Sequence, residues 1–134
     1  MAEPRIQYAQ GKVKYTRLYA DDQGISHFED LEFELSEADF APPAAPLNVS
    51  TPFAVEQCLF ASVPQNWDGD WHPAPHRQFW MQIAGEVEIE AGDGERRRFG
   101  PGSIVLLEDV SGKGHFTRVV GHGPSSGAFV QLRE

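Results

Sequence analysis

The chain has very little cysteine, which excludes an internal disulfide framework. Among its 134 residues only Cys58 carries a thiol. A lone thiol in an apolar context is more often a small buried hydrophobic group than a nucleophile. We therefore expect Cys58 to be buried, and a reducing compartment to suit the protein.

Long hydrophobic runs are also missing. No stretch approaches the roughly 18 consecutive apolar residues that a membrane helix needs, and residues 1–12 contain no apolar core of a signal peptide. These two absences predict a soluble, cytoplasmic protein.

Positive charge is scarce. Eleven Lys and Arg residues face 20 Asp and Glu residues, which gives a formal net charge of -9. This balance disfavours attraction to nucleic acid and to anionic membrane surfaces, so neither is expected as a partner. The chain also lacks the G-x-S-x-G elbow of α/β-hydrolases and the phosphate-binding G-x-x-x-x-G-K-S/T loop of P-loop proteins, so neither class of enzyme is expected.

What the chain does contain is a pattern of short alternating runs separated by 13 glycines and 10 prolines. This pattern predicts an all-β fold, and the length predicts a single domain over residues 1–134. In residues 86–91 the apolar side chains fall on one face and the glutamates on the other. Residues 103–108 are mostly apolar and too short for a typical helix, so a strand buried on both faces is expected. Further strands are predicted at residues 25–35, 53–63, 95–99 and 115–120.

Two segments of the first half carry other predictions. Residues 36–40 are expected to form a short helical turn. Residues 41–46 contain three prolines, which exclude a helix interior or a central strand and indicate a linker outside the barrel. Together with the apolar segments near the N-terminus, this linker predicts a homodimer in which added strands cover a neighbour's open sheet edge.

The most informative stretch runs from His72 to Gln78. A straight strand rising about 3.3 Å per residue would place the Cα atoms of these two residues roughly 20 Å apart. Pro73 and Pro75 lack backbone donors and hold φ near about -65°, so the stretch is better interpreted as a bend between two strands. The bend would bring His72 back opposite Gln78.

Beyond the bend, period-two alternation predicts a pocket wall. Large apolar side chains with a few polar groups are typical of small-molecule sites, and Trp67 and Trp71 lie just before the bend. Packing in the barrel core or rim is the alternative for these rings. The turn at residues 68–70 is a candidate lid. The side chains expected on the pocket face are His76, Gln78, Trp80 and Gln82.

On these residues the chain resembles the cupin superfamily. The first motif of that family reads G, five residues, H-x-H, three or four residues, E, six residues, G. Here His72 occupies the first histidine position, Ala74 the second, Gln78 the glutamate position and Gly85 the closing glycine. Two of the three ligand positions of this motif are therefore altered.

The second cupin motif carries a Pro-Gly turn and then a histidine. Residues 101–102 match the turn, and the loop at residues 112–114 delivers His115 to the histidine position. The resemblance covers about residues 55–120. It implies a double-stranded β-helix, a jelly-roll-like barrel of two antiparallel sheets with extra N-terminal strands. It also implies a frequent dimer, with a divalent metal or a small ligand at the barrel mouth.

The resemblance implies four candidate metal ligands. His72 and His115 match family positions, His76 is a candidate substitute for the histidine missing at Ala74, and Gln78 offers a neutral oxygen. Loss of a carboxylate shifts preference toward metals that suit imidazole. The candidate ions are Zn, Ni, Fe and Mn. The alternative is that His72 and His115 hydrogen-bond each other, or water, in a barrel that holds no metal.

Two functions follow. The first is a noncatalytic or sensory protein that binds a small organic ligand, with Trp71, Trp80, Gln82 and Arg118 as candidate contacts. The second is a metal-dependent enzyme of dioxygenase or isomerase type that uses the four metal-ligand candidates. An inward Arg118 would hold a ligand carboxylate, although an outward salt bridge is the favoured orientation. The altered ligand positions favour the first function.

Overall fold

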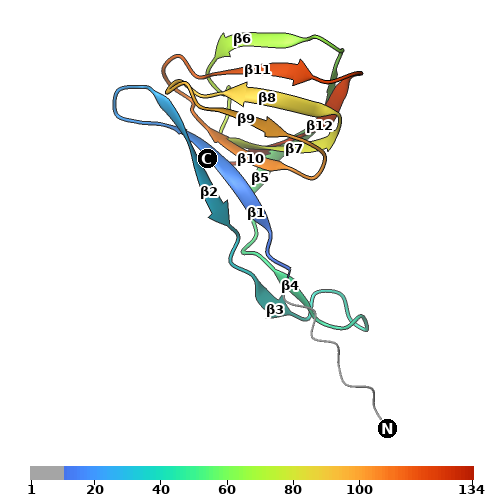
Figure 1. The fold of residues 1–134 in the computed structure, drawn as a ribbon. Helices are drawn as coiled ribbons and strands as arrows, with labels where there is room; N and C mark the ends of the chain where they lie inside the picture. Colours follow the sequence, from blue (N-terminus) through green and yellow to red (C-terminus); the bar gives the residue numbers. More distant parts are fainter. Residues whose placement is uncertain (1–10) are drawn as a thin grey trace.

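The structure, a computed structural model, describes residues 11–134, and within this range the chain forms strands and turns (Figure 1). Residues 1–10 lie outside the described residues. The expected absence of a signal peptide, and part of the expectation of a dimer, concern this segment. No helix of the described part is long and apolar enough to cross a membrane. The strands are β1 (Lys14–Ala20), β2 (Ser26–Glu32), β3 (Ser36–Ala38), β4 (Leu47–Val49), β5 (Val55–Val63), β6 (Asp68–His72), β7 (Gln78–Ala84), β8 (Glu86–Glu90), β9 (Arg96–Phe99), β10 (Ile104–Glu108), β11 (His115–Val120) and β12 (Ser125–Leu132).

Strands β5 to β12 form a jelly roll of two sheets. One sheet contains β5, β12, β7 and β10 in spatial order, and the other contains β6, β11, β8 and β9. Every connection except the β8–β9 hairpin takes the chain from one sheet to the other. This is the connectivity of a double-sheet jelly roll, so the all-β fold class predicted from the sequence is confirmed.

The N-terminal hairpin of β1 and β2 extends the first sheet beyond β10. Strand β1 pairs with β10 in parallel, whereas the other strand pairs are antiparallel. Leu18 on β1 is fully buried, and its Cα is in register with that of Leu107 on β10. The expected extra N-terminal strands are therefore present, and they contribute to the barrel core.

The predicted strand faces are observed in β8 and β10. Val87 and Ile89 are each only 2% exposed, because period-two alternation points both into the barrel. In β10, Val105 and Leu107 join the main core cluster, while Leu106 joins a second cluster on the outer face of the sheet. Strand β10 is thus buried on both faces, as its apolar sequence predicted.

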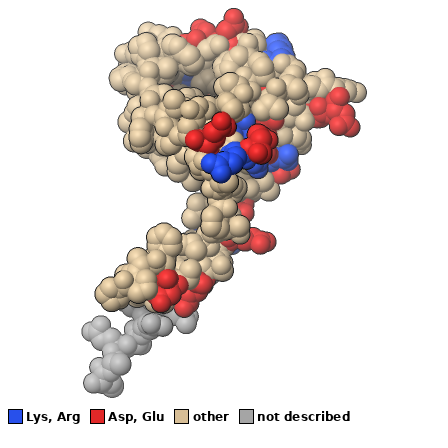
Figure 2. Space-filling model, turned by 180° about the vertical axis from the view of Figure 1, so that it is seen from behind, with Lys and Arg blue, Asp and Glu red and all other residues tan. Residues whose placement is uncertain are grey.

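The helical turn predicted at residues 36–40 is wrong. Residues Ser36–Ala38 form β3, which pairs with β4 across the proline-containing segment 41–46. A few residues form an isolated helical turn only marginally in water, so the cross-strand hydrogen bonds decide the local conformation. The β3–β4 hairpin projects away from the barrel (Figures 1 and 2).

The prediction that Cys58 is buried is also wrong. Cys58 lies on β5, which forms one edge of the six-stranded sheet and pairs only with β12. Every residue of 55–60 is exposed, including Phe60 at 81%. The side chain is exposed because no other described segment covers the outer face of this edge strand.

A candidate ligand site inside the barrel

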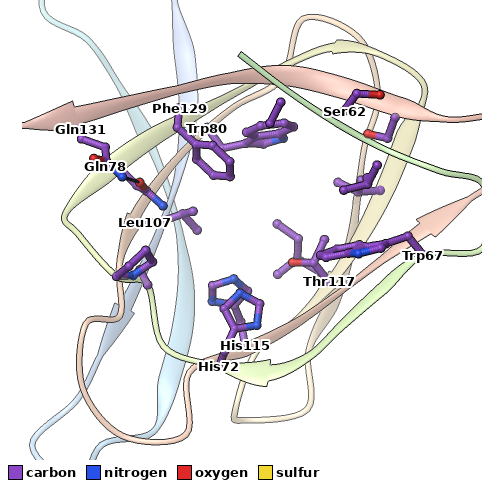
Figure 3. A pocket seen from close by; sticks show the side chains of 17 residues that line it. Ser62, Trp67, His72, Gln78, Trp80, Leu107, His115, Thr117, Phe129 and Gln131 are labelled. Carbon is purple, nitrogen blue, oxygen red and sulfur yellow. Dashed lines mark hydrogen bonds between the residues drawn. The ribbon is translucent and has the colours of Figure 1, made fainter. Parts of the chain in front are cut away.

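A cavity of about 270 Å³ lies inside the barrel, with side chains of both sheets in its wall (Figure 3). Most of the wall is apolar, and three large aromatic rings dominate it. The principal apolar residues are Val63, Trp67, Trp80, Val87, Ile89, Leu107 and Phe129, and the polar ones are Ser62, His72, Gln78, His115, Thr117, Ser125 and Gln131.

His72 and His115 lie side by side on one wall. His72 ends β6 and His115 begins β11, and their Cα atoms are partners in the antiparallel register. The imidazole centroids are 4.7 Å apart, with 57° between the ring planes. The proline bend then leads to β7, whose first residue, Gln78, lines the same cavity. The fold therefore gathers three of the predicted side chains in one cavity.

A glycine makes the close approach of these strands possible. Gly114 has a φ of +80°, and a Cβ there would overlap the backbone carbonyl of His72. Only glycine combines this φ with such contact at low energetic cost. The Gly114 carbonyl also accepts a hydrogen bond from the buried Ser26 hydroxyl at 2.8 Å. The N-terminal hairpin thus helps to position the loop that delivers His115.

Hydrogen bonds orient both imidazole rings. The Nδ1 of His72 lies 3.1 Å from the carbonyl oxygen of Gly69 and 2.9 Å from that of Asp70. The Nδ1 of His115 lies 2.6 Å from Oδ2 of Asp109. Carbonyl and carboxylate oxygens accept, so Nδ1 is the donor in each ring. In both rings the remaining nitrogen, Nε2, is left for a ligand.

Asp109 is one of the site residues that the sequence did not identify. It is completely buried, and its Oδ1 has no hydrogen-bond partner in the described part of the chain. Its backbone oxygen accepts the amide of Ala74 at 3.0 Å, which ties the end of β10 to the proline bend. An acidic residue placed between a buried strand and the glycine-rich loop before His115 was the available signal.

Three glutamines form a chain of hydrogen bonds that ends at the cavity. The amide nitrogen of Gln57 donates to Gln131, whose own Nε2 donates to Oε1 of Gln78 at 2.9 Å. Gln78 is only 2% exposed. In Figure 3 its amide nitrogen is the end turned toward the cavity. Because Oε1 already accepts a hydrogen bond, Gln78 presents a donor where a neutral oxygen ligand was expected.

A histidine and an arginine of the predicted site lie outside the cavity. His76 lines a separate surface depression together with Arg77 and Glu108. Arg118 has the outward orientation that was favoured, with Nη1 2.6 Å from a carboxylate oxygen of Glu88. This hydrogen bond raises the pKa of Arg118 and lowers that of Glu88. Neither side chain reaches the wall that carries the two imidazoles.

The aromatic candidates divide between the cavity and the surface. The ring of Trp71 packs on Phe116 outside the cavity, with 5.8 Å between the ring centroids. The ring of Trp80 packs beside that of Phe129 in the cavity wall, with 4.6 Å between the centroids. Gln82 does not line the cavity. Its Oε1 accepts the indole N–H of Trp80 at 2.8 Å, so it orients that ring.

Residues 68–70, the predicted lid, belong to β6 and not to a separate turn. The strand pairs with β11, and the register shifts between Phe116 and Arg118. Gly69 leaves room for the site, since a Cβ there would lie 2.7 Å from Trp67 and 3.0 Å from Cε1 of His72. Pairing with β11 therefore makes this segment part of a strand between Trp67 and His72, which both line the cavity.

The donor atoms do not fit a resident metal ion. Within residues 11–134 no group of three or more His, Cys, Asp or Glu side chains could hold a metal. Ala74 is buried in the cavity wall and has no donor atom. Two imidazoles alone fall short of the three or four protein ligands that catalytic and structural zinc sites use.

Phe129 and Gln131 were missed because the strand that carries them was not predicted. Both lie on β12 and face β7, opposite Trp80 and Gln78 respectively. The alternation within residues 125–132 was the signal that could have identified this strand.

No family model matches the sequence, and no curated protein matches it. A search of solved structures finds a similarity to the cupin domain of Cnp3 from Schizosaccharomyces pombe. That match has a TM-score of 0.40 and 10% sequence identity, and it covers 92% of this chain and 86% of that one. The strand order independently gives the jelly-roll barrel that the sequence motifs implied.

Proposed function

We propose that this protein binds a small organic ligand inside the barrel. One observation carries the proposal: a largely apolar cavity is lined by two oriented imidazoles from one sheet and by an amide donor from the other. Apolar cavities with a few placed polar groups are typical small-molecule sites.

The cavity dimensions limit the ligand. Its volume of about 270 Å³ is just below the range of about 300–1,000 Å³ found for drug-sized ligands. The rings of Trp67, Trp80 and Phe129 form much of the wall, and aromatic faces pack best on flat apolar groups. A ligand with one aromatic ring, or an apolar body of similar size, fits these walls.

The polar groups indicate the chemistry of the ligand's head. The Gln78 amide donates, while the Nε2 atoms of His72 and His115 accept when neutral and donate when protonated. A carbonyl or carboxyl group can use both kinds of partner. Small aromatic or apolar carbonyl and carboxyl compounds are therefore the proposed ligand class.

A titration with phenylacetate tests this proposal. Trp71 lies outside the cavity, so Trp71→Phe leaves the fluorescence of Trp67 and Trp80 as a cavity signal. Loss of one imidazole contact should weaken binding by about tenfold in His72→Ala and in His115→Ala. His122→Ala removes an exposed histidine and is the matched control. Equal affinity in all four backgrounds would contradict the proposed site.

Metal analysis separates this proposal from the metal-dependent alternative. The protein is purified from medium containing Zn, Ni, Fe and Mn, and its metal content is measured beside His72→Ala and His115→Ala. We expect substoichiometric metal and unchanged phenylacetate binding after treatment with a chelator. Stoichiometric metal that disappears in both variants would instead support the metal-dependent enzyme.

A further inference from the structure

The buried contact between Asp109 and His115 has no counterpart elsewhere in the described structure. Asp109 is 0% exposed and His115 is 3% exposed. The 2.6 Å hydrogen bond between them joins the end of β10 to the start of β11. The other histidine–carboxylate pairs involve His27 and lie on the surface. A buried carboxylate that holds one histidine and no other side chain needs an explanation beyond loop anchoring.

We propose that the cavity is catalytic, and that His115 transfers protons to and from a bound carbonyl compound without a metal. This inference rests on the proposed function, because it requires a ligand in the same cavity. Asp109 acts as a positioning residue, since its carboxylate accepts Nδ1–H and thereby directs the basic Nε2 toward the ligand. An oriented histidine of this kind is the usual general base of proton-transfer enzymes.

The geometry supports one step. The Nε2 lone pair of His115 takes a proton from the carbon beside the ligand's carbonyl group. The electron pair of that C–H bond forms the C=C bond of an enolate, and the carbonyl π electrons move to the oxygen. Return of the proton from Nε2 to the same carbon, or to another enolate atom, completes exchange or isomerisation. No oxidant, reductant or second substrate is required.

The cavity also holds a group suited to the enolate. The Nε2 of Gln78 is turned into the cavity, and the glutamine chain fixes the orientation of its amide. A preorganised donor in a largely apolar site stabilises developing negative charge on oxygen. Asp109 stabilises the positive charge that develops on His115 at the same time.

The neighbouring imidazole has a different environment. Backbone carbonyls, not a carboxylate, accept the Nδ1–H of His72. No negative side chain therefore supports a positive charge on this ring directly. The structure accordingly assigns proton transfer to His115, and ligand contact to His72.

Hydrogen–deuterium exchange tests the proposal. Phenylpyruvate, a small aromatic 2-keto acid, is incubated with the protein in D2O, and its benzylic protons are followed by NMR. We expect exchange above the rate in buffer, and a fall of at least about 100-fold in His115→Ala. Free imidazole should restore part of the rate in His115→Ala, because it can occupy the vacated space. His122→Ala is the matched control and should retain the full rate.

Asp109→Ala tests positioning separately from binding. If Asp109 orients the base, the limiting exchange rate should fall while the half-saturating phenylpyruvate concentration stays the same. Asp109→Asn keeps an acceptor oxygen, so we expect it to recover part of the rate. A change in half-saturation alone would show that Asp109 has only a structural role, and would overturn its assignment.

Alkylation of His115 tests the proposal without any substitution in the cavity. Cys58 is an exposed thiol, so the Cys58→Ser protein is treated with 2-bromoacetophenone and analysed by mass spectrometry. The Nε2 of His115 should form a bond to the CH2 carbon with loss of bromide, faster than His76 or His122 reacts. Equal labelling of all the histidines would overturn the assignment of a reactive Nε2.

The outcomes separate the two proposals. Phenylpyruvate binding, seen by tryptophan fluorescence, without exchange above the buffer rate would overturn the catalytic inference and leave the proposed function intact. Absence of both binding and exchange would overturn both proposals for this ligand class.

Discussion

Alanine at Gly114 should disrupt the site, whereas alanine at Gly121 should not. The two glycines have nearly identical backbone conformations, with φ of +80° and +79°. A Cβ at Gly114 would overlap the carbonyl of His72, whereas a Cβ at Gly121 would meet no heavy atom within 4 Å. Comparing the two alanine variants therefore separates the free-energy cost of a left-handed backbone from the cost of pushing apart the two strands that carry His72 and His115.

The expected difference can be worked out from these contacts. The left-handed conformation costs about 1–2 kcal/mol for a residue with a Cβ, and this cost is common to both variants. Gly114→Ala adds overpacking, worth about 1–3 kcal/mol. If the loop moves, it also loses the hydrogen bond from Ser26, worth about 1 kcal/mol. Gly114→Ala should therefore be less stable than Gly121→Ala by about 2–4 kcal/mol.

Urea denaturation gives the stability difference, and phenylacetate titration reports on the site. We expect a lower midpoint for Gly114→Ala and binding weaker by at least about tenfold, because displacement of β11 moves His115. Gly121→Ala should bind phenylacetate as the unchanged protein does. If the two variants have the same midpoint and affinity, the close approach of Gly114 to His72 does not organise the cavity.

Three further predictions concern other contacts. In a double-mutant cycle with Asp109→Ala and His115→Ala, urea denaturation should give a coupling energy of about 1.5–3 kcal/mol, as for a buried charge-assisted hydrogen bond; a value near zero would mean that the two side chains do not interact. The hydrogen bond to Asp21 raises the pKa of His27 and lowers that of Asp21. The stabilisation is therefore complete between the unfolded pKa values of about 4 and about 6.5, and it declines as pH rises through the folded pKa of His27. Thermal melts of His27→Ala should thus show a larger loss of stability near pH 5 than near pH 9, and an equal loss would contradict the pairing. Phe60, 81% exposed on the edge strand β5, is expected to pack against a second copy, so light scattering should report a dimer that Phe60→Glu converts to a monomer; a monomeric mass for the unchanged protein would refute this.

Several strands could be predicted because their own residues decide their faces. Alternation in residues 86–91 predicted β8, and the apolar run at residues 103–108 predicted a strand buried on both sides. Each prediction depended on period-two geometry, which holds for any strand whatever its partners. The short segment at residues 36–40 could not be predicted in this way, because its conformation depends on pairing with a strand some ten residues away.

The side chains of the cavity show where such prediction stops. His72, Gln78 and His115 were identified from spacing and motif, and all three line the cavity. His76 was placed on the same face by strand alternation, yet it precedes the first residue of β7 and lies at the surface. Local sequence marks Asp109 only as an acidic residue after a buried strand, and its role depends on a partner six residues later on β11.

The sequence by itself determined the all-β class, the faces of the regular strands and the proline bend, because backbone geometry and local alternation act over only a few residues. The tertiary structure decided that Gln78 presents a donor and that Asp109 accepts the Nδ1–H of His115. The bond between Gln131 and Gln78 joins residues far apart in the chain, and the bond between His115 and Asp109 joins the start of β11 in one sheet to the end of β10 in the other, so both form only when the barrel is assembled.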